Sequence, residues 1–278
     1  GVPKTEDFNN LEQEGVGYFQ LSTHNGLRCS AAVAYLKPIR SRKNLTIITN
    51  AQASKVLFTE RKAIGIEYIQ AGQRYSIKAQ REVLLSAGAI QSPQLLQLSG
   101  IGPAKLLQEF GIPVLHDSPG VGENLQDHLQ YRLIYQLNQN ISTNVQLSSL
   151  LGKVQIGLDW LFFRGGPLSI GINQGGLFTK VMPQSKTPDI QFHMATLSAD
   201  MAGGQVHPFP GFTMSVCQLR PESRGYVRIA SPDPLVPPKM MANYLSTQHD
   251  RDTSVAAVKF ARKLAQTGPL KALIEREL

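Results

Sequence analysis

The stretch Glu82–Gly102, "EVLLSAGAIQSPQLLQLSGIG", gives the clearest local prediction in this chain. It starts with an apolar run, Glu82–Leu85, which predicts a central parallel strand buried on both faces. Ser92 is a good N-cap, and Pro93 suits the first helical position, where its missing N–H costs nothing. The stretch therefore predicts a strand, a tight bend and a short helix that Ser99-Gly100 closes.

The bend at Ser86-Ala87-Gly88 offers room for a ligand. Gly88 has no Cβ, so a bound group could come close to the backbone. The free N–H groups of the following helical turn point outward, and the helix dipole adds partial positive charge there. These features suit an anionic or polar group such as part of a nucleotide, although an ordinary strand–helix connection explains the same pattern.

The residues around this stretch predict one meander and one larger sheet. Residues 1–27 predict an extended arm, and a short helix should run from Ser30 through Leu36 to Pro38. Four β-rich runs then predict antiparallel strands: Leu45–Thr49, Lys55–Phe58, Ala63–Tyr68 and Tyr75–Ala79. After a short helix at Lys105–Phe110, ended by Gly111, the segment Pro119–Gly122 marks a crossing between domains.

The second half of the chain predicts an antiparallel sheet flanked by helices. Helical spacing of apolar residues occurs over Leu147–Phe163 and Ser254–Ala265. The predicted strands of this sheet are Tyr131–Leu137, Gly176–Val181, Asp189–Ala195, Phe212–Leu219 and Tyr226–Ala230.

Composition limits the class of protein. The 278 residues are 42% hydrophobic and 17% charged, which is typical of a globular chain with a core. The net charge of +8 comes from scattered basic residues without interleaved aromatics, which argues against nucleic acid as a partner. Cys29 and Cys217 are far apart, and neither they nor the six histidines have metal-site spacing, so we predict no metal. This cysteine usage fits a cytoplasmic protein.

The string Gly88–Gly102 resembles the second signature of the glucose–methanol–choline (GMC) family of flavin oxidoreductases. Three other segments are similar to family segments: Glu14–Pro38, Pro119–His128 and Ser223–Asp250. The resemblance is to the bacterial branch of choline dehydrogenases and alcohol dehydrogenases. The signature positions that match are Gly88, Ser92, Pro93, Leu95, Leu96, Ser99, Gly100, Ile101 and Gly102.

The resemblance implies an α+β fold in two domains. Residues 1–125 would form a partial FAD-binding domain with the N-terminal arm, the β-meander and an incomplete Rossmann-like unit. Residues 126–278 would form the substrate-binding domain. In the family, the bend of the signature packs near the adenosine half of FAD. The residues that the resemblance assigns to the cofactor are Ala53, Ser86, Gly88, Ser92 and Pro93.

The resemblance also implies an activity, which is oxidation of the CH–OH group of a small alcohol. The hydroxyl loses a proton, a hydride passes to flavin N5, and a quinone, a dye or oxygen later takes the electrons. The protein positions the reactants and supplies electrostatics, while the flavin carries the redox chemistry. Because quinones reside in membranes, peripheral contact with a bacterial inner membrane is an open expectation.

Two parts of the family's machinery do not occur in these 278 residues. No GxGxxG fingerprint follows a strand, because none of the GxG triplets at Gly15, Gly100 and Gly120 has the third glycine. The family's catalytic histidine follows the segment matched at Tyr244, so we expect it beyond Leu278, and we interpret His207 as part of a Pro-rich loop. We therefore expect the central part of an enzyme that is inactive alone and binds FAD weakly or not at all.

Two amides bear on the substrate. In the choline-specific branch an acidic residue before a Gly-Gly pair helps to hold the trimethylammonium group, and Asn173 or Gln174 falls at that position here. A neutral amide attracts a quaternary cation less than a carboxylate does, so an uncharged alcohol is expected. Both amides could instead satisfy backbone groups in a Gly-rich bend. Two other readings of the chain stay open, a GMC oxidase that uses oxygen and a non-catalytic binding module of similar fold.

Overall fold

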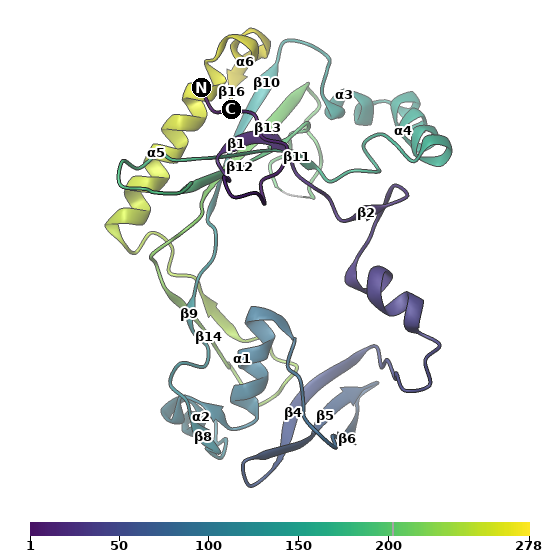
Figure 1. The fold of residues 1–278 in the computed structure, drawn as a ribbon, viewed down its shortest axis with the longest axis vertical. Helices are drawn as coiled ribbons and strands as arrows, with labels where there is room; N and C mark the ends of the chain where they lie inside the picture. Colours follow the sequence, from purple (N-terminus) through teal and green to yellow (C-terminus); the bar gives the residue numbers. More distant parts are fainter. Residues whose placement is uncertain (202) are drawn as a thin grey trace. The chain divides into compact units, whose positions relative to one another are not determined.

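The computed structural model describes residues 1–201 and 203–278, which form two compact units (Figure 1). We call them the sheet unit and the meander unit. Each unit is assembled from separate segments of the chain, whereas the sequence predicts a single division near residue 125. The roles assigned to the two predicted domains stay a prediction. The sheet unit comprises Gly1–Leu45, His128–Pro221 and Gln248–Leu278, and the meander unit comprises Thr46–Asp127 and Glu222–Thr247.

The sheet unit is built on a six-stranded antiparallel sheet in the order β1-β11-β12-β13-β10-β16. It confirms the mixed helix-and-sheet class that the sequence predicts. Four of its strands coincide with predicted ones to within a few residues. The strands are β1 (Gly15–Tyr18), β11 (Asn173–Thr179), β12 (Ile190–Ala195), β13 (Gly211–Gln218), β10 (Gln130–Leu137) and β16 (Ile274–Glu277).

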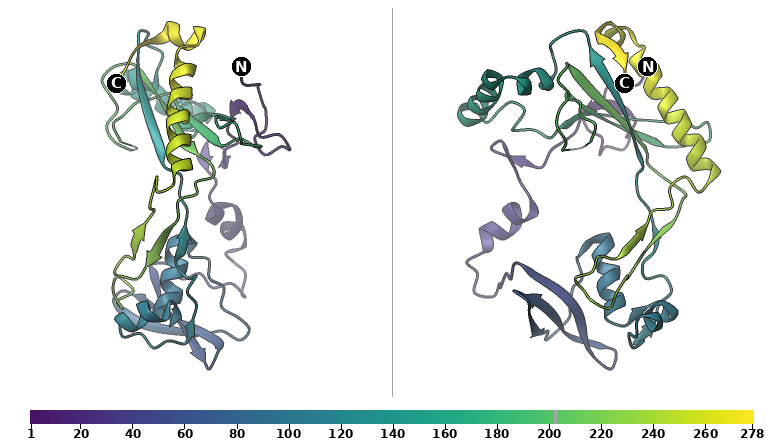
Figure 2. Two further views of the ribbon diagram at one scale, coloured as in Figure 1. Left: turned by 90° about the vertical axis from the view of Figure 1, so that its left-hand side faces the viewer. Right: turned by 180° about the vertical axis from the view of Figure 1, so that it is seen from behind.

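Helix α5 (Gln248–Ala265) packs against one face of this sheet and encloses the main core (Figure 2, yellow helix). Alternate strand residues, such as Phe192 and Met214, point to that face and are fully buried. Each such side chain contributes about 1.5–3 kcal/mol of hydrophobic stabilisation. The small side chains of Ala257 and Ala261 let the helix approach the strands closely.

The N-terminal arm is extended, as predicted, but residues 15–18 of it form the edge strand β1 on β11. A short hairpin follows, made of β2 (Thr23–His24) and β3 (Leu27–Arg28). The predicted helix from Ser30 is a π-helical segment, η1 (Ala32–Leu36), continued by the 3-10 segment η2 (Lys37–Ile39), where Pro38 prevents further regular helix.

The predicted helix Leu147–Phe163 is wrong at its start, because two helices occupy this region. They are α3 (Thr143–Ser148) and α4 (Leu150–Phe163). Ser149 separates them, since its Oγ accepts the N–H of Gly152 and caps α4. Only Ile156 of α4 is buried. Large apolar side chains of α4 are exposed at Leu150, Leu151, Val154, Leu158, Leu161, Phe162 and Phe163.

The meander unit contains the predicted hairpin strands as β4 (Ala51–Thr59), β5 (Lys62–Gln70) and β6 (Gln73–Lys78). The predicted strand Leu45–Thr49 is wrong, because the chain there has no strand partner. The predicted strand Tyr226–Ala230 forms as β14 (Gly225–Arg228), but it pairs with β9 (Glu123–Leu125) and β15 (Lys239–Met241) rather than with the large sheet. Short parallel strands β7 (Ile101–Gly102) and β8 (His116–Asp117) flank α2 (Ala104–Glu109).

The opening stretch folds differently from its prediction in two respects. Glu82–Leu85 is not a strand, and Leu84 is 78% exposed, because no strand among the described residues lies beside it to pair. Helix α1 (Gly88–Leu98) begins before Ser92, so Pro93 lies inside it. Ser92 Oγ accepts the N–H of Ala87 at 3.1 Å, which satisfies one free donor at the helix start and lets the first turn form ahead of the proline.

Candidate functional site

The candidate site is a hollow in the meander unit between β4 and α1. Its volume is about 200 Å³, smaller than the roughly 300–1,000 Å³ of pockets that enclose whole small ligands. It therefore suits one part of a larger ligand. The lining combines strand residues, two turns of helix and a proline: Ala51, Gln52, Ala53, Ala87, Gln91, Gln94, Leu95, Leu98 and Pro234.

Gly88 stands next to this lining in a conformation that favours glycine. Its φ is +82°, a region that L-residues rarely adopt. A Cβ built there would meet nothing within 4 Å, so the space beside this backbone is open. The expected room beside this backbone is present, and the structure adds that the backbone itself needs glycine. Binding of a group there stays a prediction.

The five predicted cofactor residues are brought to one region but not to one surface. Ala53 lines the hollow, and Gly88 follows its lining residue Ala87. Ser92 contacts the same bend through its hydrogen bond to Ala87, and it is not the N-cap that was predicted. Pro93 follows Ser92 in the helix. Ser86 is exposed, in the coil that leads into the helix. Whether these residues bind a cofactor stays a prediction.

Sequence reasoning missed three amides that line the hollow. They are Gln52 on β4 and Gln91 and Gln94 on α1. A side-chain amide both donates and accepts, so these residues can recognise a flat polar group such as a nucleobase. A signal was present, because Gln91, Gln94, Leu95 and Leu98 follow the spacing of one helical face.

Buried hydrogen bonds fix the wall of the hollow. Ser99 Oγ accepts the N–H of Val56 on β4 at 2.9 Å and donates to the carbonyl of Leu95 at 2.6 Å. Gln94 Nε2 donates to the carbonyl of Val236 at 2.9 Å. These bonds hold α1 against β4 and against the segment that carries Pro234, so the lining is fixed before any ligand binds.

The predicted substrate residues lie in the sheet unit, at the start of β11. Asn173 is exposed and Gln174 is half-buried. The ladder with β12 shifts register between Asn173 and Gly175, so Gln174 lies in a β-bulge. The backbone N–H of Phe19 donates to the carbonyl of Gln174 at 2.9 Å. Neither amide side chain has a hydrogen bond to another described residue, and their binding role stays a prediction.

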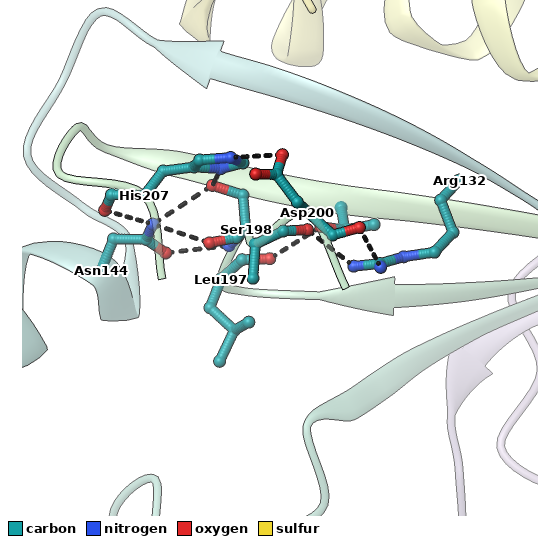
Figure 3. A network of polar contacts seen from close by, with 8 residues as sticks. Arg132, Asn144, Leu197, Ser198, Asp200 and His207 are labelled. Atoms are coloured by element: carbon teal, nitrogen blue, oxygen red, sulfur yellow. Dashed lines mark hydrogen bonds and ion pairs between the residues drawn. The ribbon is translucent and has the colours of Figure 1, made fainter. Parts of the chain in front are cut away.

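His207 belongs to a polar network that extends from the buried Ser198 and Asn144 to the exposed Asp200 (Figure 3). Its Nδ1 lies 3.1 Å from Ser198 Oγ, and its Nε2 lies 3.1 Å from Asp200 Oδ1. Asn144 Nδ2 donates to Ser198 and to the carbonyl of His207. Ser198 is 0% exposed. These residues have the composition of a hydrolytic triad, but a nucleophilic serine must reach its substrate, so the network is structural.

No group of three or more potential metal ligands occurs in the described part of the chain. Nor does any helix in residues 1–201 and 203–278 combine the length and apolarity needed to cross a bilayer.

The amino-acid sequence matches two profiles of one protein family. Residues 1–130 match the N-terminal profile of the GMC oxidoreductases, and residues 221–278 match their C-terminal profile. The chain belongs to the GMC oxidoreductase family, which confirms the resemblance seen in the sequence.

Individual relatives agree with this family. The chain is 38% identical over 275 residues to an alcohol dehydrogenase [acceptor] of Pseudomonas putida, covering 98% of this chain and 50% of that protein. It is 40% identical over 283 residues to an oxygen-dependent choline dehydrogenase of Pseudomonas fluorescens, covering 100% of this chain and 49% of that protein. The chain thus spans about half the length of the curated relatives it matches.

Solved structures also match this chain over about half of their own length. Pyridoxine 4-oxidase from Mesorbium loti superposes with a TM-score of 0.84 at 26% identity, covering 100% of this chain and 51% of that one. A formate oxidase superposes with a TM-score of 0.83 at 22% identity, covering 92% of this chain and 49% of that one, which is a likeness of fold.

Proposed function

We propose that the whole protein is an FAD-dependent oxidoreductase that oxidises the CH–OH group of a small alcohol. The observation that carries this proposal is the hollow between β4 and α1, beside the family signature and its positive-φ glycine. The size of the hollow and its three amides fit the adenine end of a dinucleotide. Relatives named as alcohol and choline dehydrogenases support the reaction class.

In this proposal the residues of this chain bind and orient. Bound FAD would supply the acceptor for the hydride. Ala53 would offer its backbone to the base, and Gln52, Gln91 and Gln94 would offer donors and acceptors to its polar edge. The apolar side chains of Leu95 and Leu98 would exclude water from the flat face of the base. Since none of these groups titrates near neutral pH, binding of the adenine end should be independent of pH between about 6 and 8.

The 278-residue chain by itself should not turn over alcohols. It holds no dinucleotide fingerprint for a pyrophosphate and no His-Pro-x-Gly-Thr string for the acid–base residue. A hollow that binds only one end of FAD gives weak binding, because affinity grows with the number of subsites that are occupied together. Purification of this chain with a stoichiometric flavin absorbance would contradict this part of the proposal.

The proposed substrate is an uncharged alcohol rather than choline. Asn173 and Gln174 stand where the choline-specific branch has an acid, and an amide lacks the full Coulomb attraction for a quaternary cation. Turnover of choline and of primary alcohols by the full-length protein tests this directly, with a dye as the acceptor. Choline as the better substrate would refute the substrate class, and absence of oxidation of any alcohol would refute the reaction.

The identity of the electron acceptor distinguishes two versions of the proposed activity, a dehydrogenase and an oxidase. The proposal takes a dehydrogenase that passes electrons to a quinone or a dye, and the alternative is an oxidase. An oxidase is a real alternative because similar solved structures include one named as an oxidase. Oxygen consumption during alcohol turnover, measured with and without the dye, separates the two versions.

We also propose that the whole protein contacts a membrane at its periphery through α4. Seven large apolar side chains of this one helix are exposed, and Lys153 and Arg164 flank them. Apolar helices with basic neighbours lie in the interface of anionic bilayers, where a quinone would be within reach.

A further inference from the structure

The two faces of the six-stranded sheet differ in chemistry. The face toward α5 carries the large apolar side chains of the core, such as Phe192 and Val216. On the opposite face the strand residues include Phe178 and Ile134 as well as a row of small or polar residues. Across the sheet they align as direct antiparallel partners, Gly176 with His193, His193 with Ser215, and Ser215 with Arg132. Phe178 packs against Phe8 and Phe19, while the row itself carries no large apolar side chain.

One aromatic side chain covers the glycine in this row. The ring of Phe19, which follows β1, lies over Gly176, where a Cβ would be 2.5 Å from its Cζ atom. The same ring stacks on the imidazole of His193, with centroids 5.2 Å apart and planes 27° from parallel. A glycine at position 176 is therefore required for this stack, and Phe19 remains half-exposed in it.

The β-bulge at Gln174 brings Asn173 to the same face as this pair. Asn173 is the partner of Ala195, while Gly176 is the partner of His193. Residues 193 and 195 of one strand share a face, and direct partners in an antiparallel ladder share a face as well. The Phe19–His193 stack thus adjoins the stretch to which the substrate was assigned, and the Phe19 backbone donates to Gln174.

The strands around the stack carry no negative charge, but the carboxylate of Asp7 accepts a hydrogen bond from Gln20, which follows Phe19. Strands β1, β10, β11, β12 and β13 contain no aspartate or glutamate. Burial lowers the pKa of His193 below its ordinary value, and the nearby His128 lowers it further. The lowered pKa favours the neutral form of the imidazole, which suits an uncharged ligand beside the two stacked rings.

We propose that Phe19 and His193 form the wall that receives the hydrocarbon part of an uncharged alcohol, and that they determine which alcohols are accepted. This inference deepens the proposed function and depends on it. It names two residues that neither the signature nor the Asn173–Gln174 stretch includes.

The test uses the full-length protein with bound flavin and a series of primary alcohols of two, four and six carbons. In Phe19→Ala the preference for the six-carbon over the two-carbon alcohol, measured as the ratio of kcat/KM values, should fall by about tenfold. Most of this change should be in KM, because the wall binds the part of the substrate that does not react. His193→Phe, which keeps a ring, should change the ratio by less than about threefold.

Two variants keep the test valid if Phe19→Ala folds poorly. Gly176→Ala leaves Phe19 in the chain but displaces its ring, and it should reproduce the loss of chain-length preference. Tyr18→Ala removes the exposed neighbour on β1 and should leave the ratio unchanged. Calorimetric binding of trifluoroethanol, which resists oxidation, gives a readout without turnover and should weaken in Phe19→Ala.

The outcomes separate this inference from the proposed function. If the wild-type protein oxidises alcohols but Phe19→Ala and Gly176→Ala keep the chain-length preference within about twofold, the wall is refuted and the proposed function stands. If the wild-type protein oxidises no alcohol, the proposed function fails, and the inference fails with it.

Discussion

The hydroxyl of Ser99 on the C-terminal cap of α1 accepts the backbone N–H of Val56 at 2.9 Å, which joins the helix to the middle of β4. Both residues are buried, and Ser99 is one of the signature positions. The fixed serine of the signature is therefore explained by packing: it satisfies a strand N–H in the wall of the hollow, and it need not contact a ligand.

Replacement of Ser99 by alanine should lower the stability of the protein. The substitution leaves the Val56 N–H buried without an acceptor, which costs about 1–3 kcal/mol. Chemical denaturation of the full-length protein measures this loss. Ser86→Ala is the matched control, since Ser86 is exposed, and its change should stay within about 0.5 kcal/mol. Equal effects of the two substitutions would show that the Ser99 bond contributes nothing.

Gln97→Leu should be more destabilising. The Gln97 side chain is 0% exposed and connects α1 to two other segments. Its Nε2 donates to the carbonyls of Val121 and Val227, and its Oε1 accepts the N–H of Ile229. Leucine of similar size leaves all three backbone groups unpaired, so a loss of about 3 kcal/mol or more is expected.

The measurement for Gln97 is again the midpoint and slope of denaturant unfolding. Gln108→Leu on the exposed surface of α2 is the control and should be close to neutral. A Gln97→Leu protein as stable as the wild type would mean that water replaces the three bonds.

Gly88→Ala should reduce flavin content in the full-length protein. At φ +82° an L-residue costs about 1–2 kcal/mol, and its methyl group enters the open space beside the hollow. Gly111→Ala is a matched control, since Gly111 has φ +66° and equally open surroundings but does not adjoin the hollow. Both variants should lose similar stability, and only Gly88→Ala should lose flavin, measured by the ratio of visible to ultraviolet absorbance.

The stability of the protein should depend on the protonation of His193. Its pKa is lowered in the folded state because burial disfavours the charged imidazole. In the unfolded chain it takes up a proton near pH 6.5, so as the pH falls below about 6.5 the unfolded state binds more protons and stability falls. The loss stops below the folded-state pKa, where both states are protonated.

Thermal unfolding between about pH 5 and pH 7.5 tests this titration. His193→Phe should flatten the decline at acidic pH while changing the melting temperature at pH 7.5 less. An identical decline in the variant would assign the pH dependence to other groups.

The exposed face of α4 should bind anionic vesicles. Full-length protein should float with vesicles that contain about one-third phosphatidylglycerol, and should float less with neutral vesicles or at high salt. Leu151→Ser combined with Phe162→Ser removes apolar area and should abolish flotation without loss of flavin. Variants that change the oligomeric state or unfold would assign this face to a second copy or to the rest of the polypeptide.

Much of the architecture could be predicted from the sequence. Alternation of apolar and polar residues in β10, β12 and β13 and helical spacing of apolar residues in α5 are local patterns. Each pattern predicted the element that the structure shows. The positive φ of Gly111 follows from its position just after the end of α2, which glycine adopts cheaply. The signature helix and the family were also readable, since they depend on residue types at fixed spacing.

Other features depend on which segments meet, and a local pattern does not contain that information. The apolar run Glu82–Leu85 has strand propensity, but a strand needs a partner on its edge to satisfy its backbone, and the described residues provide none. Strand β14 has the same residue pattern as the strands of the large sheet, yet it pairs with β9 and β15. The side chain of Gln97 on α1 donates to the carbonyl of Val227 in β14, which ties this strand to the meander unit.

The sequence by itself determined the family, the sheet and helix periodicities and the glycine at the bend, because each is set by residue type and near neighbours in the chain. Only the tertiary structure decided which side chains line the hollow, that Ser99 supports its wall, and that Phe19 lies on His193 above Gly176. Those contacts join residues far apart in sequence, and they exist only when the packing of the whole unit brings them together.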